Sequence, residues 1–183
     1  MQLKVIKSSG NTEEYLHTKV IGTFSNALAL VDQSSTFTAE QFAEAITFYL
    51  YEKRDTSSIT SDRIHLMVQG VLTATGYDNA SKALNEYRLE RRLSRSRIEV
   101  VDDKDDEIGT PMMVCQWDKS VIFEDMVREF ALSRHVARAI ASAVEQKILK
   151  LGMTRIRRSL IKEFVTADMD VMLRAEMELQ AAE

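Results

Sequence analysis

Residues that break helices or form cross-links are scarce in this chain of 183 residues, which has one cysteine, one proline and six glycines. The single cysteine excludes an internal disulfide and a zinc site built from several cysteines of this chain. Few breakers, together with nine methionines, predict a mostly helical protein. No apolar run approaches the roughly 20 residues that cross a bilayer, and no signal-peptide pattern opens the chain. We therefore expect a cytoplasmic protein that does not enter a membrane.

Charge is unevenly distributed along the chain. The formal net charge of −4 argues against nucleic acid as the main ligand, because that affinity depends on neutralising phosphates. Residues 82–97 nevertheless carry six lysines and arginines against two glutamates, and residues 99–107 are strongly acidic. We interpret these segments as a basic helix that ends one domain and an acidic linker, residues 99–111. The predicted domains are residues 1–98 and 112–183.

Hydrophobic spacing predicts the order of the elements. Residues 2–7 alternate, residues 12–16 alternate less cleanly, and the sequence S-S-G-N between them favours an N-terminal β-hairpin. Helical spacing then predicts four helices, of which three begin near Thr18, Thr38 and Thr60 and the fourth begins at Asp78 or Asn79. Thr38 with Gln41 has the form of a capping box. We expect a mostly α fold, in which the hairpin and a four-helix unit precede a shortened helical repeat.

The second half of the chain resembles the first in its apolar pattern. An apolar helical run from Val121 to Val127 follows Trp117-Asp118-Lys119, and two further helices are expected from Ser133 to about Leu151 and from about Thr154 to near Glu178. Two triplets of apolar residues have counterparts further along. At an offset of 94, Phe42, Ala43 and Ile46 match Val136, Ala137 and Ile140. At an offset of 97, Ile59, Ile64 and Val68 match Ile156, Ile161 and Val165. An insertion of three residues would reconcile the offsets, and the pattern suggests a duplication.

Three separated motifs resemble one known family. They are V-x-K-x-x-G from Val5 to Gly10, followed by Glu13 and Lys19; I-x-S-x-x-I-H from Ile59 to His65; and Y-R-x-x-R-R from Tyr87 to Arg92. In order and spacing they resemble the ATP-cone domain, over about residues 3–95. Residues 114–165 look like a second, truncated cone, whose first strand and lysine-glycine turn are not recognisable. They are also similar to the helical segment that follows the cone in anaerobic ribonucleotide reductases.

The resemblance implies a non-catalytic regulator. ATP-cones are nucleotide-sensing modules of ribonucleotide reductases and of a zinc-ribbon repressor, and in reductases they bind ATP or dATP and shift the enzyme between assemblies. It implies ATP or dATP with magnesium as the ligand, and a ribonucleotide reductase or a second copy of the chain as the partner. The implied site residues are Val5, Lys7, Glu13, Lys19, Ser61, His65, Arg88, Arg91 and Arg92.

The resemblance also implies a role for each site residue. Val5 would lie beside the adenine, and Lys7 and Lys19 would face phosphates. Glu13 and Ser61 would lie near the base or sugar. The remaining residues, His65 and some of Arg88, Arg91 and Arg92, would close on the phosphate tail.

Physical reasoning supports an anion site on separate grounds. A triphosphate needs cations from several elements, because one exposed lysine contributes little in water. The N–H groups of a glycine-containing turn and of a helix N-terminus add oriented positive charge.

The sequence departs from the family at Ser8 and Ser9, where arginine and aspartate are usual. Losing the arginine removes a bidentate phosphate donor, which predicts weaker binding or a changed nucleotide preference.

Two other functions remain open. A transcriptional regulator would contact DNA through the basic helix of residues 82–97, although the chain lacks the paired cysteines of the zinc-ribbon repressor. A helical adaptor would keep the cone only as a scaffold and bind its partner without nucleotide. The amphipathic last helix, with Met169, Met172 and Met177, suits docking or dimerisation. No glycine-rich loop followed by Lys-Ser/Thr and no metal-ligand spacing supports an enzyme.

Overall fold

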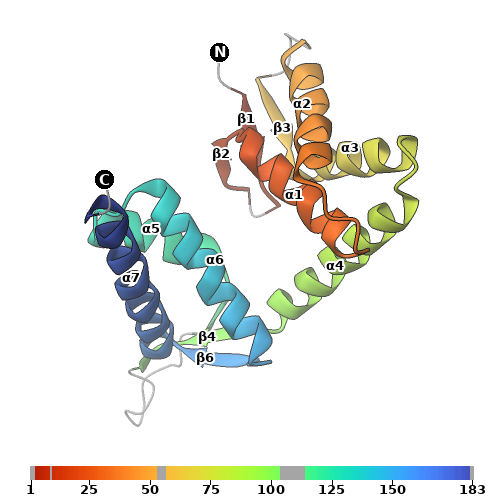
Figure 1. Cartoon of the computed structure of the whole chain (residues 1–183). Coiled ribbons are helices and arrows are strands. Elements are labelled where there is room, and N and C mark those ends of the chain that lie inside the picture. The colour runs from red at the N-terminus through yellow and green to blue at the C-terminus, as the bar shows by residue number, and fades with distance from the viewer. Residues whose placement is uncertain (1–2, 9, 53–56, 104–113, 182–183) are drawn as a thin grey trace. The chain divides into compact units, whose positions relative to one another are not determined.

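A computed structural model of the chain describes residues 3–8, 10–52, 57–103 and 114–181 (Figure 1). It divides into two compact units, Met1–Glu90 and Arg91–Glu183. Each unit combines helices with a small three-stranded sheet, so the predicted mostly α fold is confirmed. The boundary between the units falls inside a helix rather than after residue 98, where the sequence analysis placed it.

The first unit contains the predicted hairpin and helices. The elements in chain order are β1 (Lys4–Ile6), β2 (Thr12–Glu14), α1 (His17–Ala29), α2 (Thr36–Glu52), β3 (Ser58–Thr60), α3 (Ser61–Ala74) and α4 (Asp78–Ser96), whose last turns belong to the second unit. Strand β1 is central, antiparallel to β2 and parallel to β3. The third strand was not predicted, because three residues are too few to show an alternating pattern.

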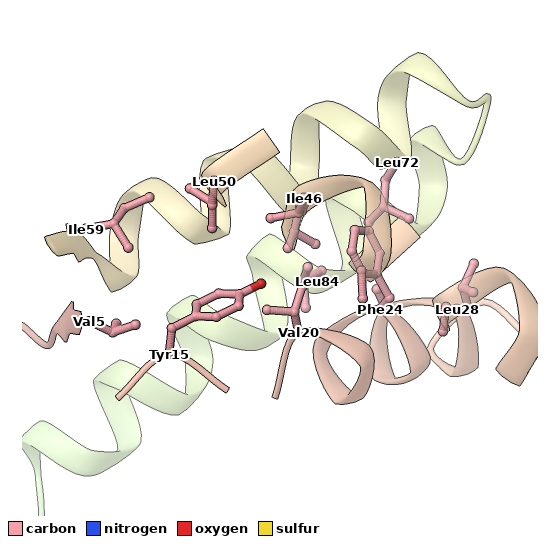
Figure 2. Close-up of a cluster of buried hydrophobic side chains, with 14 of the residues drawn as sticks. Val5, Tyr15, Val20, Phe24, Leu28, Ile46, Leu50, Ile59, Leu72 and Leu84 are labelled. Carbon is pink, nitrogen blue, oxygen red and sulfur yellow. The ribbon is translucent and has the colours of Figure 1, made fainter. Parts of the chain in front are cut away.

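Helical stripes from α1, α2 and α3 form the core of the first unit. Phe24 and Leu28 of α1, Ile46 of α2 and Leu72 of α3 are almost completely buried, and Figure 2 shows them gathered between the helices. This burial of apolar faces stabilises helices that propensity alone would leave marginal.

One predicted cap is confirmed and another is corrected. Thr60 accepts a hydrogen bond from the Arg63 amide at 3.2 Å and caps α3 as expected. The predicted capping box at Thr38 is wrong, because α2 starts earlier. The Ser35 hydroxyl accepts the Thr38 amide at 3.2 Å and caps that helix.

The second unit repeats this arrangement with its own sheet. After the end of α4 come β4 (Glu99–Val101), β5 (Val114–Gln116), α5 (Lys119–Glu129), α6 (Arg134–Lys150), β6 (Arg155–Arg157) and α7 (Arg158–Ala181). Strand β4 is central, antiparallel to β5 and parallel to β6. The first strand, missed in the sequence, therefore lies at the start of the predicted acidic linker. Most of that linker, residues 104–111, lies outside the described residues.

Equivalent contacts show which residues of the two units correspond in the sequence. Val5 pairs with Ile59 as Val100 pairs with Ile156, which confirms the offset of 97. Ser35 caps α2 as Ser133 caps α6, and both helices have 17 residues, so their offset is 98. The predicted offset of 94 is wrong by four residues. A shift of about one helical turn preserves an apolar stripe, and spacing alone did not reveal the error.

Candidate functional site

Two lysines from different elements converge on one carboxylate in the first unit. Lys7 directly follows β1, Glu13 lies in the middle of β2, and Lys19 lies in the first turn of α1. Lys7 Nζ lies 2.8 Å from Oε2 of Glu13, and Lys19 Nζ lies 2.6 Å from Oε1. The structure thus brings together three of the residues expected at the site.

The charges of Lys7, Lys19 and Glu13 together favour the binding of a second anion. Burial alone would raise the pKa of Glu13, but hydrogen bonds from Lys19 and Lys7 outweigh burial and hold that pKa below its ordinary value. Two positive charges therefore face one ionised carboxylate. Both lysine side chains remain more than a third exposed, so a ligand can reach them from solvent.

The hairpin turn next to Lys7 is built on a left-handed glycine. Gly10 has φ of +85°, which favours glycine because side chains crowd the backbone there. Its amide donates to the Lys7 carbonyl at 2.9 Å, and the Lys7 amide donates to the Asn11 carbonyl at 2.8 Å. Ser8 is exposed at this turn, whereas Ser9 lies outside the described residues. The turn thereby fixes where the backbone presents Lys7.

The N-terminus of α3 lies beside the end of β1. Strands β1 and β3 are parallel, and their last paired residues are Ile6 and Thr60. The next residues along the two strands are Lys7 and Ser61, and Ser61 is the first residue of α3. A helix N-terminus carries partial positive charge and favours anions. The fold therefore places a lysine and a helix N-terminus at the same end of two neighbouring strands.

Arg88 and His65 lie further along α3 and α4. Arg88 forms an ion pair with Asp62 in the first turn of α3. Burial lowers the pKa of His65, and the nearby positive charge of Arg88 lowers it further. Nε2 of His65 is buried and has no hydrogen-bond partner among the described residues. Burial and Arg88 thus favour the neutral form of His65.

The structure does not bring every expected residue to this place. Val5 lies in the hydrophobic core with 7% of its surface exposed, which leaves little side chain for an adenine to contact (Figure 2). Arg91 belongs to the second unit, where its guanidinium pairs with Glu145 at 2.6 Å. Arg92 is exposed on the same unit.

A buried carboxylate that the sequence analysis missed organises the second unit. Glu145 of α6 is fully buried. Its Oε2 accepts from Arg91 at 2.6 Å and from Arg95 at 2.8 Å, and it lies 3.4 Å from Lys119. Its Oε1 accepts from Arg95 at 2.8 Å and from the Trp117 indole at 3.3 Å. Burial opposes ionisation, but the bonds from Arg95 and the charge of Lys119 hold the pKa of Glu145 at about 2.

The first unit has a neutral contact in the equivalent place. At the offset of 98, Thr47 of α2 corresponds to Glu145, and its hydroxyl donates to the Ala43 carbonyl at 2.8 Å. The single hydroxyl hydrogen is then used, so Tyr15 and His17 both donate to Thr47 Oγ1, at 2.7 and 2.8 Å. His17 accordingly carries a proton on Nδ1.

Carboxylates fill the second unit's counterpart of the lysine site. Asp102 follows β4 as Lys7 follows β1, and it forms an ion pair with Arg158 at 3.0 Å. Oδ1 of Asp103 accepts from the Ser159 amide at 3.3 Å and from its hydroxyl at 2.6 Å. These bonds from Ser159 hold the pKa of Asp103 below its ordinary value. An anionic group of the chain thus lies at the N-terminus of α7.

Comparisons with known proteins add no assignment. No protein-family model matches the chain, and no curated protein matches it. Among the described residues, no three His, Cys, Asp or Glu side chains gather as they would to hold a metal ion. No helix in the described part of the chain is long and apolar enough to cross a membrane.

Proposed function

We propose that the first unit binds the phosphate tail of ATP or dATP and that the protein is a non-catalytic regulator. The convergence of Lys7 and Lys19 on Glu13, beside the N-terminus of α3, carries the proposal. Cations from two elements and a helix N-terminus together supply what a polyphosphate needs. Magnesium would accompany the nucleotide, held by phosphate oxygens that match its preference for oxygen ligands.

The second unit supports this interpretation through an internal comparison. There Asp103 already lies on the N-terminus of the helix that follows the third strand. In the first unit the positions of Asp102 and Asp103 are occupied by Lys7, a cation, and Ser8, a neutral residue. The same backbone arrangement therefore holds the chain's own anion in one unit and presents cations in the other. Of these two equivalent positions, the one in the first unit is suited to an external phosphate.

Regulation would follow from competition for the two lysines. A bound phosphate takes Lys7 and Lys19 at the expense of Glu13, which then loses the partners that hold its pKa down. This change alters the link between the hairpin and α1. A state that binds nucleotide better becomes more populated when nucleotide is present. The readout would be self-association or binding to a ribonucleotide reductase.

The structure gives less support to DNA recognition by the basic helix. Arg88 is paired with Asp62, and Arg91 and Arg95 are paired with Glu145. These carboxylates offset part of the positive charge that the helix would offer to DNA phosphates. The helical adaptor differs from the preferred proposal in one respect: it predicts that loss of the lysines leaves partner binding unchanged.

Calorimetric titration with ATP and dATP in the presence of magnesium tests the proposal. We expect saturable binding by the wild type and about tenfold weaker binding by Lys7→Ala and by Lys19→Ala, because each removes a charge-assisted contact. Lys82→Ala, an exposed lysine on α4 of the same unit, is the matched control and should bind normally. Absence of binding at millimolar nucleotide would overturn the proposal.

A further inference from the structure

Three cations meet a single carboxylate in the second unit. Arg91 and Arg95 come from the end of α4, Lys119 is the first residue of α5, and Glu145 lies on α6. Glu145 is fully buried, whereas the side chains of Arg95 and Lys119 are 40% and 35% exposed. The cluster therefore has two positive charges more than negative ones, and part of that charge faces solvent.

The two solvent-facing cations of this cluster share one carboxylate. Among the described residues, Arg95 and Lys119 form ion pairs only with Glu145. Both oxygens of Glu145 already accept from several donors, so the carboxylate offers little further capacity. Burial lowers the pKa of Lys119, and repulsion from Arg95 and Arg91 adds to this effect against the attraction of Glu145. Half-buried cations in this arrangement favour a second anion.

We propose that Arg95 and Lys119, with the less exposed Arg91, bind a phosphate group that carries two negative charges. A dianion would balance the cluster, and the planar donor fork of arginine matches phosphate oxygens. The phosphate is either free or part of a nucleotide. This site does not depend on the function proposed for the first unit, since all its residues belong to the second. It also differs from the N-terminus of α7, where Asp103 already lies.

The chain contains a built-in reporter for this site. Trp117 is the only tryptophan, and its indole N–H donates to Glu145 in the centre of the cluster. A phosphate that draws Arg95 or Lys119 away from Glu145 changes the surroundings of the indole. The fluorescence of Trp117, measured together with calorimetry, therefore reports how much of the phosphate site is occupied.

The experiment uses the full chain carrying Lys7→Ala and Lys19→Ala, so that the proposed first-unit site cannot contribute. Pyrophosphate, ADP and uncharged adenosine are titrated at constant ionic strength. We expect saturable binding of pyrophosphate and ADP and none of adenosine. Equal affinity for the first two identifies the phosphate alone as the ligand, and tighter binding of ADP identifies a nucleotide. Either result supports the site.

Variants separate a built site from general attraction. In this background Lys119→Ala should weaken pyrophosphate binding about tenfold, because a charge-assisted contact is lost while Glu145 keeps both arginines. Lys150→Ala removes the same charge from an exposed position on α6 and should have no effect. Absence of both heat and fluorescence change would overturn the proposal. Equal weakening by Lys119→Ala and Lys150→Ala would also overturn it.

Discussion

Tyr15 and Trp117 occupy the same position in the two units. Each follows the second strand of its sheet, and each donates its backbone N–H to the carbonyl of the residue before the first strand, at 2.9 and 3.1 Å. Each side chain also donates to the equivalent position of the second long helix, Thr47 or Glu145. One backbone arrangement thus supports a neutral polar contact in the first unit and a charged cluster in the second.

Glu145→Gln should destabilise the second unit strongly. The neutral amide keeps the shape of the side chain but leaves Arg91, Arg95 and Lys119 to repel one another. Breaking a buried ion pair costs about 3 kcal/mol when its partners are partly exposed, as they are here. Urea unfolding followed by Trp117 fluorescence measures the loss. Glu163→Gln, at an exposed position on α7, should stay within about 0.5 kcal/mol of the wild type. Equal effects of the two substitutions would contradict the structure.

Acid should unfold the protein partly through the same carboxylate. The pKa of Glu145 is about 2 in the folded protein against an ordinary value of 4.5. A lowered folded pKa contributes stability above the unfolded pKa, and that stability is lost as the pH falls. We expect a loss of about 3 kcal/mol between roughly pH 5 and pH 2. The free energy of unfolding of Glu145→Gln should not show this loss as the pH falls. If the variant loses stability as steeply as the wild type, Glu145 is not the source of the acid dependence.

Thr47→Val should destabilise the first unit. Valine keeps the branched shape but removes the oxygen that accepts from Tyr15 and His17, and their donors are then left without this partner. We expect a cost of about 2 kcal/mol in the free energy of unfolding. The control is Thr73→Val at an exposed position on α3. If Thr47→Val costs no more than this control, the shared contact is not stabilising.

Asp103→Ala should loosen the start of α7 without unfolding the unit. The carboxylate holds the amide and hydroxyl of Ser159 at the first turn of that helix. Hydrogen exchange should become faster at the Ser159 amide and remain unchanged in the middle of α6. Asp170→Ala, an exposed change further along α7, should leave the Ser159 amide as it was. Unchanged exchange in Asp103→Ala would show that the aspartate does not hold the helix end.

The long helices and the N-terminal hairpin were predictable from the sequence, and the other short strands were not. Apolar residues at helical spacing are a direct consequence of one buried helix face, so α1 to α4 and α6 were visible. Strands of three residues, such as Glu99–Val101, hold at most one and a half alternations. Their partners across the sheet lie far away in sequence, and pairing depends on the whole unit. For this reason β3, β4, β5 and β6 were missed, and the last helix was expected to begin near Thr154, where β6 lies.

The candidate site was predictable in part. The spacing of Lys7, Glu13 and Lys19 follows from a hairpin and the helix after it, and these residues do meet. The role of Glu145 was not visible, because a glutamate in a helix resembles a surface charge and its arginine partners lie 50 and 54 residues away. The arginines of α4 therefore looked unpaired in the sequence, although two of them share this one carboxylate.

Amide chemical shifts in isotope-labelled full-length protein locate nucleotide binding residue by residue. On addition of ATP with magnesium, we predict saturable shifts at Gly10, Lys19 and Ser61, which belong to the three elements around the lysine pair. In Lys7→Ala the same titration should require about tenfold more nucleotide. No shift at these three amides at millimolar ATP would contradict nucleotide binding by the first unit.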